Sequence, residues 1–144
     1  MTKRVYEQKM IEPQDFDKLI KKLRGFFVQN GYMETFPQPR LSILAACEDP
    51  KTVRGFNFAG DIWPLAQTNQ IWLERDILAN YDKLDGVYCL TTSYRDEPNP
   101  IEGRHEKIFA MFEAEHKGDF DHLLETLKKI CVHLELVKSV DDIP

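Results

Sequence analysis

The chain has 144 residues, of which 42% are hydrophobic and 30% are charged, and its formal net charge is −5. This composition predicts one folded domain over residues 1–144 and excludes a chain that is disordered throughout. The acidic balance argues against broad binding to nucleic acid through phosphate contacts.

The first predicted element is a helix that begins near Phe16 and ends near Asn30 and Gly31. Apolar residues recur along it at helical spacing, and glycine readily takes the left-handed conformation that ends helices. A short β-rich segment follows at residues 31–36, and Pro37 and Pro39 do not suit a long central strand. The apolar face of the helix comprises Phe16, Leu19, Ile20, Leu23, Phe26 and Phe27.

The middle of the chain carries signals of mixed strength. Residues 41–47, LSILAAC, fit either a short helix or a buried strand. The alternating aromatics and the glycines of residues 54–66, RGFNFAGDIWPLA, predict a β-hairpin. A second helix is expected over about Asn69 to Leu78, with Thr68 as its N-cap.

A second hairpin is predicted from residues 86–95, GVYCLTTSYR, and residues 108–118, IFAMFEAEHKG. Both runs are rich in β-branched or aromatic residues, and the Pro- and Gly-containing segment 98–103 separates them with a loop longer than a tight turn needs. A last amphipathic helix is expected from about Asp119 to Leu136, with Asp119 as its cap.

Cysteine usage and hydropathy bear on the cell compartment. Cys47, Cys89 and Cys131 are widely spaced within apolar runs, so buried, reduced thiols are expected rather than disulfides or a zinc site. No stretch approaches the apolar length of a membrane span, and the first residues do not resemble a signal peptide. The sequence therefore predicts a cytoplasmic protein.

The charges of the second hairpin suggest a binding site. Side chains alternate along a strand, so Arg95 and Glu97 are expected on one face of the first strand, and Phe109, Glu113 and Glu115 on one face of the second. A guanidinium can bind a phosphate, an aromatic ring can stack on a base, and two carboxylates can hold Mg²⁺. Alternatively, the four charged residues form cross-strand ion pairs on a solvated face.

The order of these residues resembles a known family. Tyr94-Arg95-Asp96-Glu97, Arg104-His105 and Phe109 with its downstream acidic pair are similar, over residues 88–115, to the second motif of class II aminoacyl-tRNA synthetases. The likeness is greatest to the aspartate, asparagine and lysine subgroup. Residues 16–39 resemble the first motif, a dimer-interface helix leading to a strand and a proline. The resemblance implies an α+β fold, an antiparallel sheet flanked by helices, lacking the last part of that core.

The resemblance also implies roles for individual side chains. Arg95 would contact the α-phosphate of ATP as the main catalytic cation, and Phe109 would stack on adenine. Glu97, Arg104 and His105 would contact adenine or the outer phosphates, while Mg²⁺ would accompany the nucleotide.

Two further positions are expected near an amino-acid substrate. Gln70 lies in a segment similar to the family's substrate-binding helix, and Glu48 lies where the family places a carboxylate for the α-ammonium group. Alternatively, Gln70 is an ordinary helix-surface amide and Glu48 an ordinary turn residue. The sequence departs from the family pattern at Ile108, where a Glu is usual, and shows no Gly-rich segment with a second catalytic Arg after Glu115.

These features together predict a homodimeric, synthetase-like domain that binds ATP and a small amino acid. Adenylation is expected if the rest of the core is present in a longer chain. Charging of tRNA by these residues alone is not expected, because no anticodon-binding segment is recognisable. One alternative is a non-catalytic paralogue that acts in dimerisation or partner binding. Another is an amide ligase of the asparagine-synthetase type, which would use ammonia as acceptor.

Overall fold

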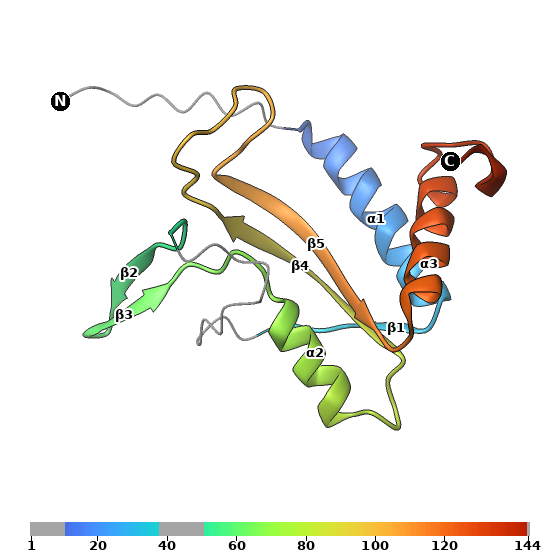
Figure 1. Cartoon of the computed structure of the whole chain (residues 1–144), viewed down its shortest axis with the longest axis horizontal. Coiled ribbons are helices and arrows are strands. Elements are labelled where there is room, and N and C mark those ends of the chain that lie inside the picture. Colours follow the sequence, from blue (N-terminus) through green and yellow to red (C-terminus); the bar gives the residue numbers. More distant parts are fainter. Residues whose placement is uncertain (1–10, 38–50, 144) are drawn as a thin grey trace. The chain divides into compact units, whose positions relative to one another are not determined.

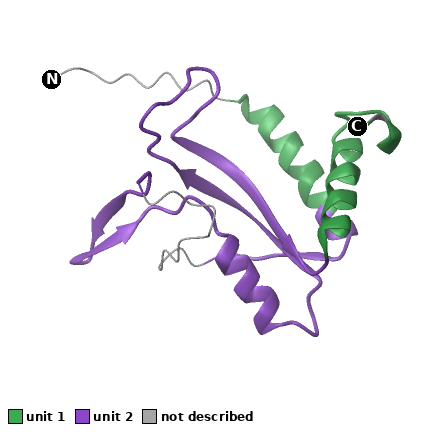
Figure 2. Ribbon diagram, viewed as in Figure 1, with its two compact units in different colours: residues 1–26, 119–144 green, residues 27–118 purple. Residues whose placement is uncertain are grey.

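The computed structural model describes residues 11–37 and 51–143, whose helices and strands Figure 1 labels. They form two compact units, one from residues 27–118 and one from the described parts of 1–26 and 119–144 (Figure 2). Residues 41–47 and Glu48 lie outside the described residues, as do Pro39 and Cys47. The elements are α1 (Pro13–Gln29), β1 (Tyr32–Glu34), β2 (Gly55–Phe58), β3 (Asp61–Pro64), α2 (Gln70–Ala79), β4 (Gly86–Tyr94), β5 (Ile108–His116), α3 (Phe120–His133) and the 3₁₀ turn η1 (Val140–Asp142).

The smaller unit contains α3 and most of α1, and both helices were predicted. A ring nitrogen of His133, Nε2, lies 2.9 Å from the Lys22 carbonyl oxygen, and the His133 ring lies 5.3 Å from that of Phe26. The predicted cap of α3 is confirmed, since Asp119 Oδ1 accepts the His122 N–H at 3.0 Å. The helix ends earlier than expected, at His133. Its apolar residues Phe120, Leu123, Leu124 and Leu127 are exposed.

The larger unit is built on a sheet with strand order β1-β4-β5. Strands β4 and β5 pair antiparallel along their whole length, from Gly86↔His116 to Tyr94↔Ile108, which confirms the predicted hairpin. Strand β1 adds a parallel pair that the sequence did not predict, starting at Tyr32↔Gly86. A side chain at Gly86 would meet the Tyr32 ring at 2.5 Å, so this pairing requires glycine.

Each face of the β4–β5 hairpin is packed differently. Leu73 and Ile77 of α2 pack with Val87 and Cys89 of β4 to form a buried apolar cluster on one face. On the other face, Phe112 stacks between Phe27 and Tyr88, with ring centroids 5.2 Å from both. These contacts hold the hairpin rigidly between a helix and an aromatic stack.

The predicted hairpin of residues 54–66 is confirmed as β2 and β3, which form a separate two-stranded sheet. Ala59 and Gly60 both have positive φ, 53° and 88°, as the common two-residue hairpin turn requires. Among the described residues, no helix is long and apolar enough to cross a membrane.

Candidate nucleotide-binding site

The candidate site lies on the face of the β4–β5 hairpin that carries α2. Because residues opposite one another in an antiparallel pair share a face, Ser93↔Phe109, Cys89↔Glu113 and Val87↔Glu115 place Phe109, Glu113 and Glu115 on this side. The predicted alternation along the second strand is therefore present in the structure.

Arg95 and Phe109 are the two predicted residues that the structure brings together. The Arg95 N–H donates to the Lys107 carbonyl at 2.8 Å, which continues the ladder one residue beyond β4. Its guanidinium carbon lies 5.6 Å from the centre of the Phe109 ring. The Arg95 side chain is exposed and the Phe109 ring half-buried, so a cation and an aromatic surface adjoin at the open end of the sheet.

Arg104 and His105 lie in a turn of the loop between the strands. The turn begins at Ile101, whose N–H donates to His105 Nδ1 at 3.2 Å and whose carbonyl accepts the His105 N–H at 2.9 Å. Gly103 has a φ of 75° within it. Arg104 is exposed and Glu97 is half-buried, and within residues 11–37 and 51–143 no ion pair joins Glu97 to Arg95. These hydrogen bonds to Ile101 fix the position of His105 within the loop.

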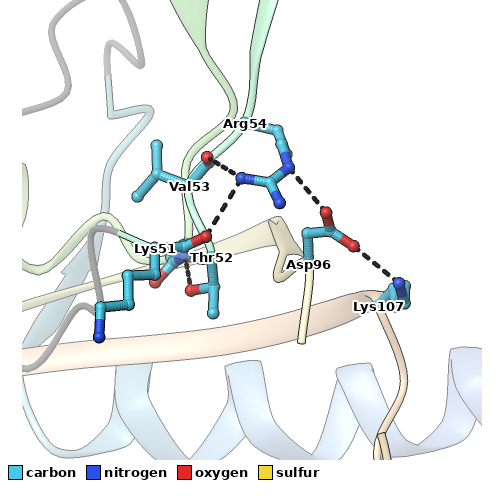
Figure 3. Close-up of polar contacts among 7 residues, drawn as sticks. Lys51, Thr52, Val53, Arg54, Asp96 and Lys107 are labelled. Carbon is cyan, nitrogen blue, oxygen red and sulfur yellow. Dashed lines mark hydrogen bonds and ion pairs between the residues drawn. The ribbon is translucent and has the colours of Figure 1, made fainter. Parts of the chain in front are cut away.

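The ion pairs at this hairpin involve Asp96, which sequence reasoning missed (Figure 3). Its carboxylate lies 2.7 Å from Arg54 Nε and 2.7 Å from Lys107 Nζ. Its backbone N–H donates to the Thr52 carbonyl at 3.1 Å, and Arg54 Nη1 donates to the carbonyls of Lys51 and Val53. Lys107 first, and Arg54 second, hold the pKa of Asp96 below its usual value.

The start of α2 is held by β5 as well as by the side chain of Thr68. The N-cap is Asn69 and not the predicted Thr68, and the Asn69 side chain makes no capping bond. Instead, the Glu113 carboxylate accepts the Asn69 N–H at 2.9 and 3.0 Å, the Asn69 Nδ2 at 3.2 Å and the Thr68 hydroxyl. A carboxylate suits this place because the first N–H groups of a helix lack partners within the helix.

Gln70 is the first residue of α2. Its backbone N–H donates to Thr68 Oγ1 at 3.1 Å, and its side-chain amide donates to Glu74 at 2.9 Å. Glu48, the other residue expected to contact the amino acid, lies outside the described residues.

Glu115 lies further along the same strand, in a more acidic environment. Its side chain is half-buried, and burial first, with the Glu74 carboxylate second, raises its pKa. The same crowding acts on the neighbouring thiol, since burial and the Glu113 and Glu34 carboxylates raise the pKa of Cys89 to about 12. Cys89 is thus the buried, free thiol that the sequence predicted, and Cys131 is free and half-buried.

Glu113 and Glu115 do not fit a magnesium ion shared with phosphates beside Arg95. The acceptor positions of Glu113 face three donors of the α2 start. A strand rises about 3.4 Å per residue, so Glu115 lies roughly 20 Å along β5 from Phe109. The described ranges contain no group of three or more His, Cys, Asp or Glu side chains that could hold a metal ion.

An apolar cleft of about 640 Å³ adjoins the same part of β4. Aromatic side chains of the β2–β3 hairpin form one wall, and the last residues of β4 form the other. The Trp63 Nε1–H donates to the Phe58 carbonyl at 3.0 Å, which fixes the indole at the wall. The lining includes Phe56, Phe58, Trp63, Thr91, Thr92 and Tyr94.

Comparison with known proteins gives this geometry a context. The asparagine-tRNA ligase of Koribacter versatilis is 27% identical over 124 residues, which are 85% of this chain and 26% of the relative. The asparaginyl-tRNA synthetase of Pyrococcus horikoshii, solved with asparaginyl-adenylate, matches with a TM-score of 0.71 and 24% identity over 82% of this chain and 26% of its own. The chain has the fold of part of a class II aminoacyl-tRNA synthetase core.

A second solved structure agrees with this assignment. The asparaginyl-tRNA synthetase of Entamoeba histolytica, also in complex with asparaginyl-adenylate, has a TM-score of 0.70 and 22% identity over 85% of this chain and 26% of its own. No family model matches the chain. The synthetase-like chain thus spans about a quarter of the length of these relatives, and the resemblance predicted from the residues around Arg95 and Phe109 is confirmed.

Proposed function

We propose that this synthetase-like chain binds ATP and a small amino acid on the α2 side of the β4–β5 hairpin and takes part in amino-acid adenylation. The observation that carries the proposal is the Arg95 guanidinium 5.6 Å from the half-buried Phe109 ring, at the open end of paired strands. The likeness to two synthetases solved with asparaginyl-adenylate supports it. Asparagine is therefore the first amino acid to test.

In this reaction a carboxylate oxygen of the amino acid attacks the α-phosphorus of ATP, and pyrophosphate leaves. The protein contributes position and charge rather than a nucleophile. Arg95 would bind the α-phosphate through two parallel N–H···O bonds, while Phe109 would stack on adenine. The guanidinium would remain beside the phosphate as negative charge develops on its oxygens, which lowers the barrier.

The remaining predicted residues have supporting roles in this proposal. Glu97, Arg104 and His105 would contact adenine or the outer phosphates from the segment that joins β4 to β5. Gln70 at the start of α2 and Glu48 would contact the amino acid. No residue of the described chain is assigned to Mg²⁺, and no step of the proposal depends on one.

A non-hydrolysable analogue of asparaginyl-adenylate tests the proposal without requiring turnover. If the chain binds both the nucleotide and the amino-acid part of the analogue, the analogue should bind at least about tenfold more tightly than AMP. The amino-acid part adds contacts at little further entropic cost. Analogues that carry other amino acids serve as matched controls for the amino-acid half. An analogue that binds no more tightly than AMP would contradict an adenylation role.

We also propose that the chain forms a homodimer through its first motif. Phe36, which follows β1, is 88% exposed, and Met33 and Val28, three and eight residues before it in the sequence, are exposed too. Exposed apolar side chains of this size are typical of interfaces when they cluster. Sedimentation should report a dimer that Phe36→Ser weakens, and a wild-type monomer at micromolar concentration would contradict this part of the proposal.

A further inference from the structure

The strongest unassigned feature of the larger unit is the link between Glu113 and the start of α2. Glu113 lies 44 residues from Asn69 in the sequence, yet both of its oxygens accept the Asn69 N–H. Helices are usually capped by the side chain of their own N-cap residue, and Asn69 makes no such bond. Thr68 Oγ1 accepts the Gln70 N–H at 3.1 Å, and the carboxylate of a neighbouring strand accepts the Asn69 N–H.

The link is buried and has several points of attachment. Asn69 is 2% exposed, and its Nδ2 group donates to Thr91 Oγ1 of β4 at 2.9 Å as well as to Glu113 of β5 at 3.2 Å. The Thr68 hydroxyl donates to the same carboxylate. The first residues of α2 are therefore bound to both strands of the hairpin through one polar cluster. A buried cluster in which each member has partners fixes geometry more strongly than surface contacts do.

This cluster determines where Gln70 lies relative to the nucleotide end of the sheet. Gln70 is bonded through its N–H to Thr68 Oγ1, which is itself bonded to Glu113. Phe109 precedes Glu113 by four residues on the same face of the same strand, about 14 Å along it. The Gln70 amide and the Phe109 ring are thus connected by a short, continuous series of strand backbone and hydrogen bonds.

We propose that Glu113 is a positioning residue, which holds the start of α2, and with it Gln70, at a set place relative to Arg95 and Phe109. The inference rests on the proposed function for its purpose, because it makes Glu113 the connection between the amino-acid half and the nucleotide half of the site. It also replaces the sequence-based role of Glu113 as a metal ligand, since the carboxylate already serves the helix.

The first arm of the test needs no ligand. Hydrogen exchange of the unliganded chain is compared among wild type, Glu113→Gln, Thr68→Ala and Thr68→Ser. Loss of a charge-assisted bond should speed exchange at residues 69–73 by about ten- to a hundredfold in Glu113→Gln. The effect should be smaller in Thr68→Ala and absent in Thr68→Ser, which keeps the hydroxyl. Glu115→Gln, two residues along the same face, is the matched control and should leave these amides unchanged.

The second arm measures the affinity of AMP and of the asparaginyl-adenylate analogue for the same variants. Glu113→Gln should leave the Kd of AMP within about twofold of the wild-type value. It should reduce the ratio of the AMP Kd to the analogue Kd by about tenfold. If exchange at residues 69–73 does not change, Glu113 does not anchor the helix and the inference is wrong. If exchange changes but the advantage of the analogue persists, the anchor exists without the positioning role.

The two arms separate this inference from the proposed function. If wild type binds neither AMP nor the analogue, the proposed function fails, and the positioning role fails with it, while the exchange arm still decides whether Glu113 anchors α2. If AMP affinity itself falls in Glu113→Gln and added Mg²⁺ restores it, Glu113 is a metal ligand and the inference is overturned.

Discussion

Replacement of Phe109 by alanine separates a ligand-binding ring from a structural one. Phe109 is half-buried and its one aromatic or cationic neighbour in the described chain is the exposed Arg95 guanidinium, 5.6 Å from the ring centre. A cation–π contact at an exposed site is worth about 0.5–1 kcal/mol, and the lost packing of the half-buried ring adds roughly as much, so Phe109→Ala should lower the free energy of unfolding by about 1–2 kcal/mol. Stacking of a base on an aromatic ring is worth about 1–3 kcal/mol, which weakens nucleotide affinity roughly 5- to 150-fold.

Phe112 is the matched control, three residues further along β5 on the opposite face. Its ring stacks between Tyr88 and Phe27 at 5.2 Å from each. Loss of two aromatic pairs and of the half-buried packing should cost about 2–4 kcal/mol of stability in Phe112→Ala. Because that face carries no proposed ligand contact, the affinity of the folded fraction for ATP should be unchanged.

The assay combines chemical denaturation with titration of ATP under conditions in which each variant is folded. The expected pattern is a loss of affinity without much loss of stability for Phe109→Ala, and the reverse for Phe112→Ala. If Phe109→Ala instead loses stability as Phe112→Ala does and keeps its ATP affinity, Phe109 belongs to the core and the proposed stacking is wrong.

Three further changes test the electrostatics of the hairpin. Lys107 and Arg54 lower the pKa of Asp96. Its ion pairs therefore stabilise the folded chain above the ordinary Asp pKa, and this stabilisation is lost as the pH falls through the lowered pKa. Asp96→Asn should reduce Tm at pH 7, and the Tm difference from wild type should vanish in acid. Burial raises the pKa of Glu115, because the ionised form is less favourable in the folded chain than in the unfolded chain. Glu115→Gln should therefore raise Tm at pH 7 and have little effect below the ordinary Glu pKa, and a lower Tm at pH 7 would contradict this reasoning. With a pKa of about 12, the Cys89 thiol should resist alkylation at pH 8 in the native chain and react after denaturation, as peptide mass mapping would show.

Short-range sequence patterns predicted many of the helices and strands. The spacing of apolar residues and the capping residue Asp119 predict the helices, because both signals act within a few residues. Strand alternation places Arg95 and Phe109 on one face, since the β4–β5 register has no bulge that would move either residue to the other face. The part of the site that depends on one hairpin was therefore predictable.

The contacts that the sequence did not predict join distant segments. Asp96 pairs with Arg54, 42 residues away, and Glu113 binds the start of α2 across 44 residues. Two acidic residues spaced two apart on a strand can bind a metal, or one of them can accept the N–H groups at the start of a helix, and the sequence pattern is the same in both cases. Only the placement of α2 decides between them. The parallel pairing of β1 is non-local in the same way, and no turn signal announces it.

Nucleotide binding by the β4–β5 hairpin is tested by a calorimetric titration of ATP, with Mg²⁺ present, into wild type, Arg95→Ala and Arg75→Ala. Arg75 is a matched control because its guanidinium lies 5.4 Å from the Trp72 ring on α2, in a similar cation–π contact away from the sheet end. If Arg95 binds the α-phosphate, ATP should bind wild type saturably, Arg95→Ala should abolish that binding, and Arg75→Ala should preserve it. Binding that survives in Arg95→Ala, or is absent from wild type, would contradict the assignment of the β4–β5 hairpin as a nucleotide site.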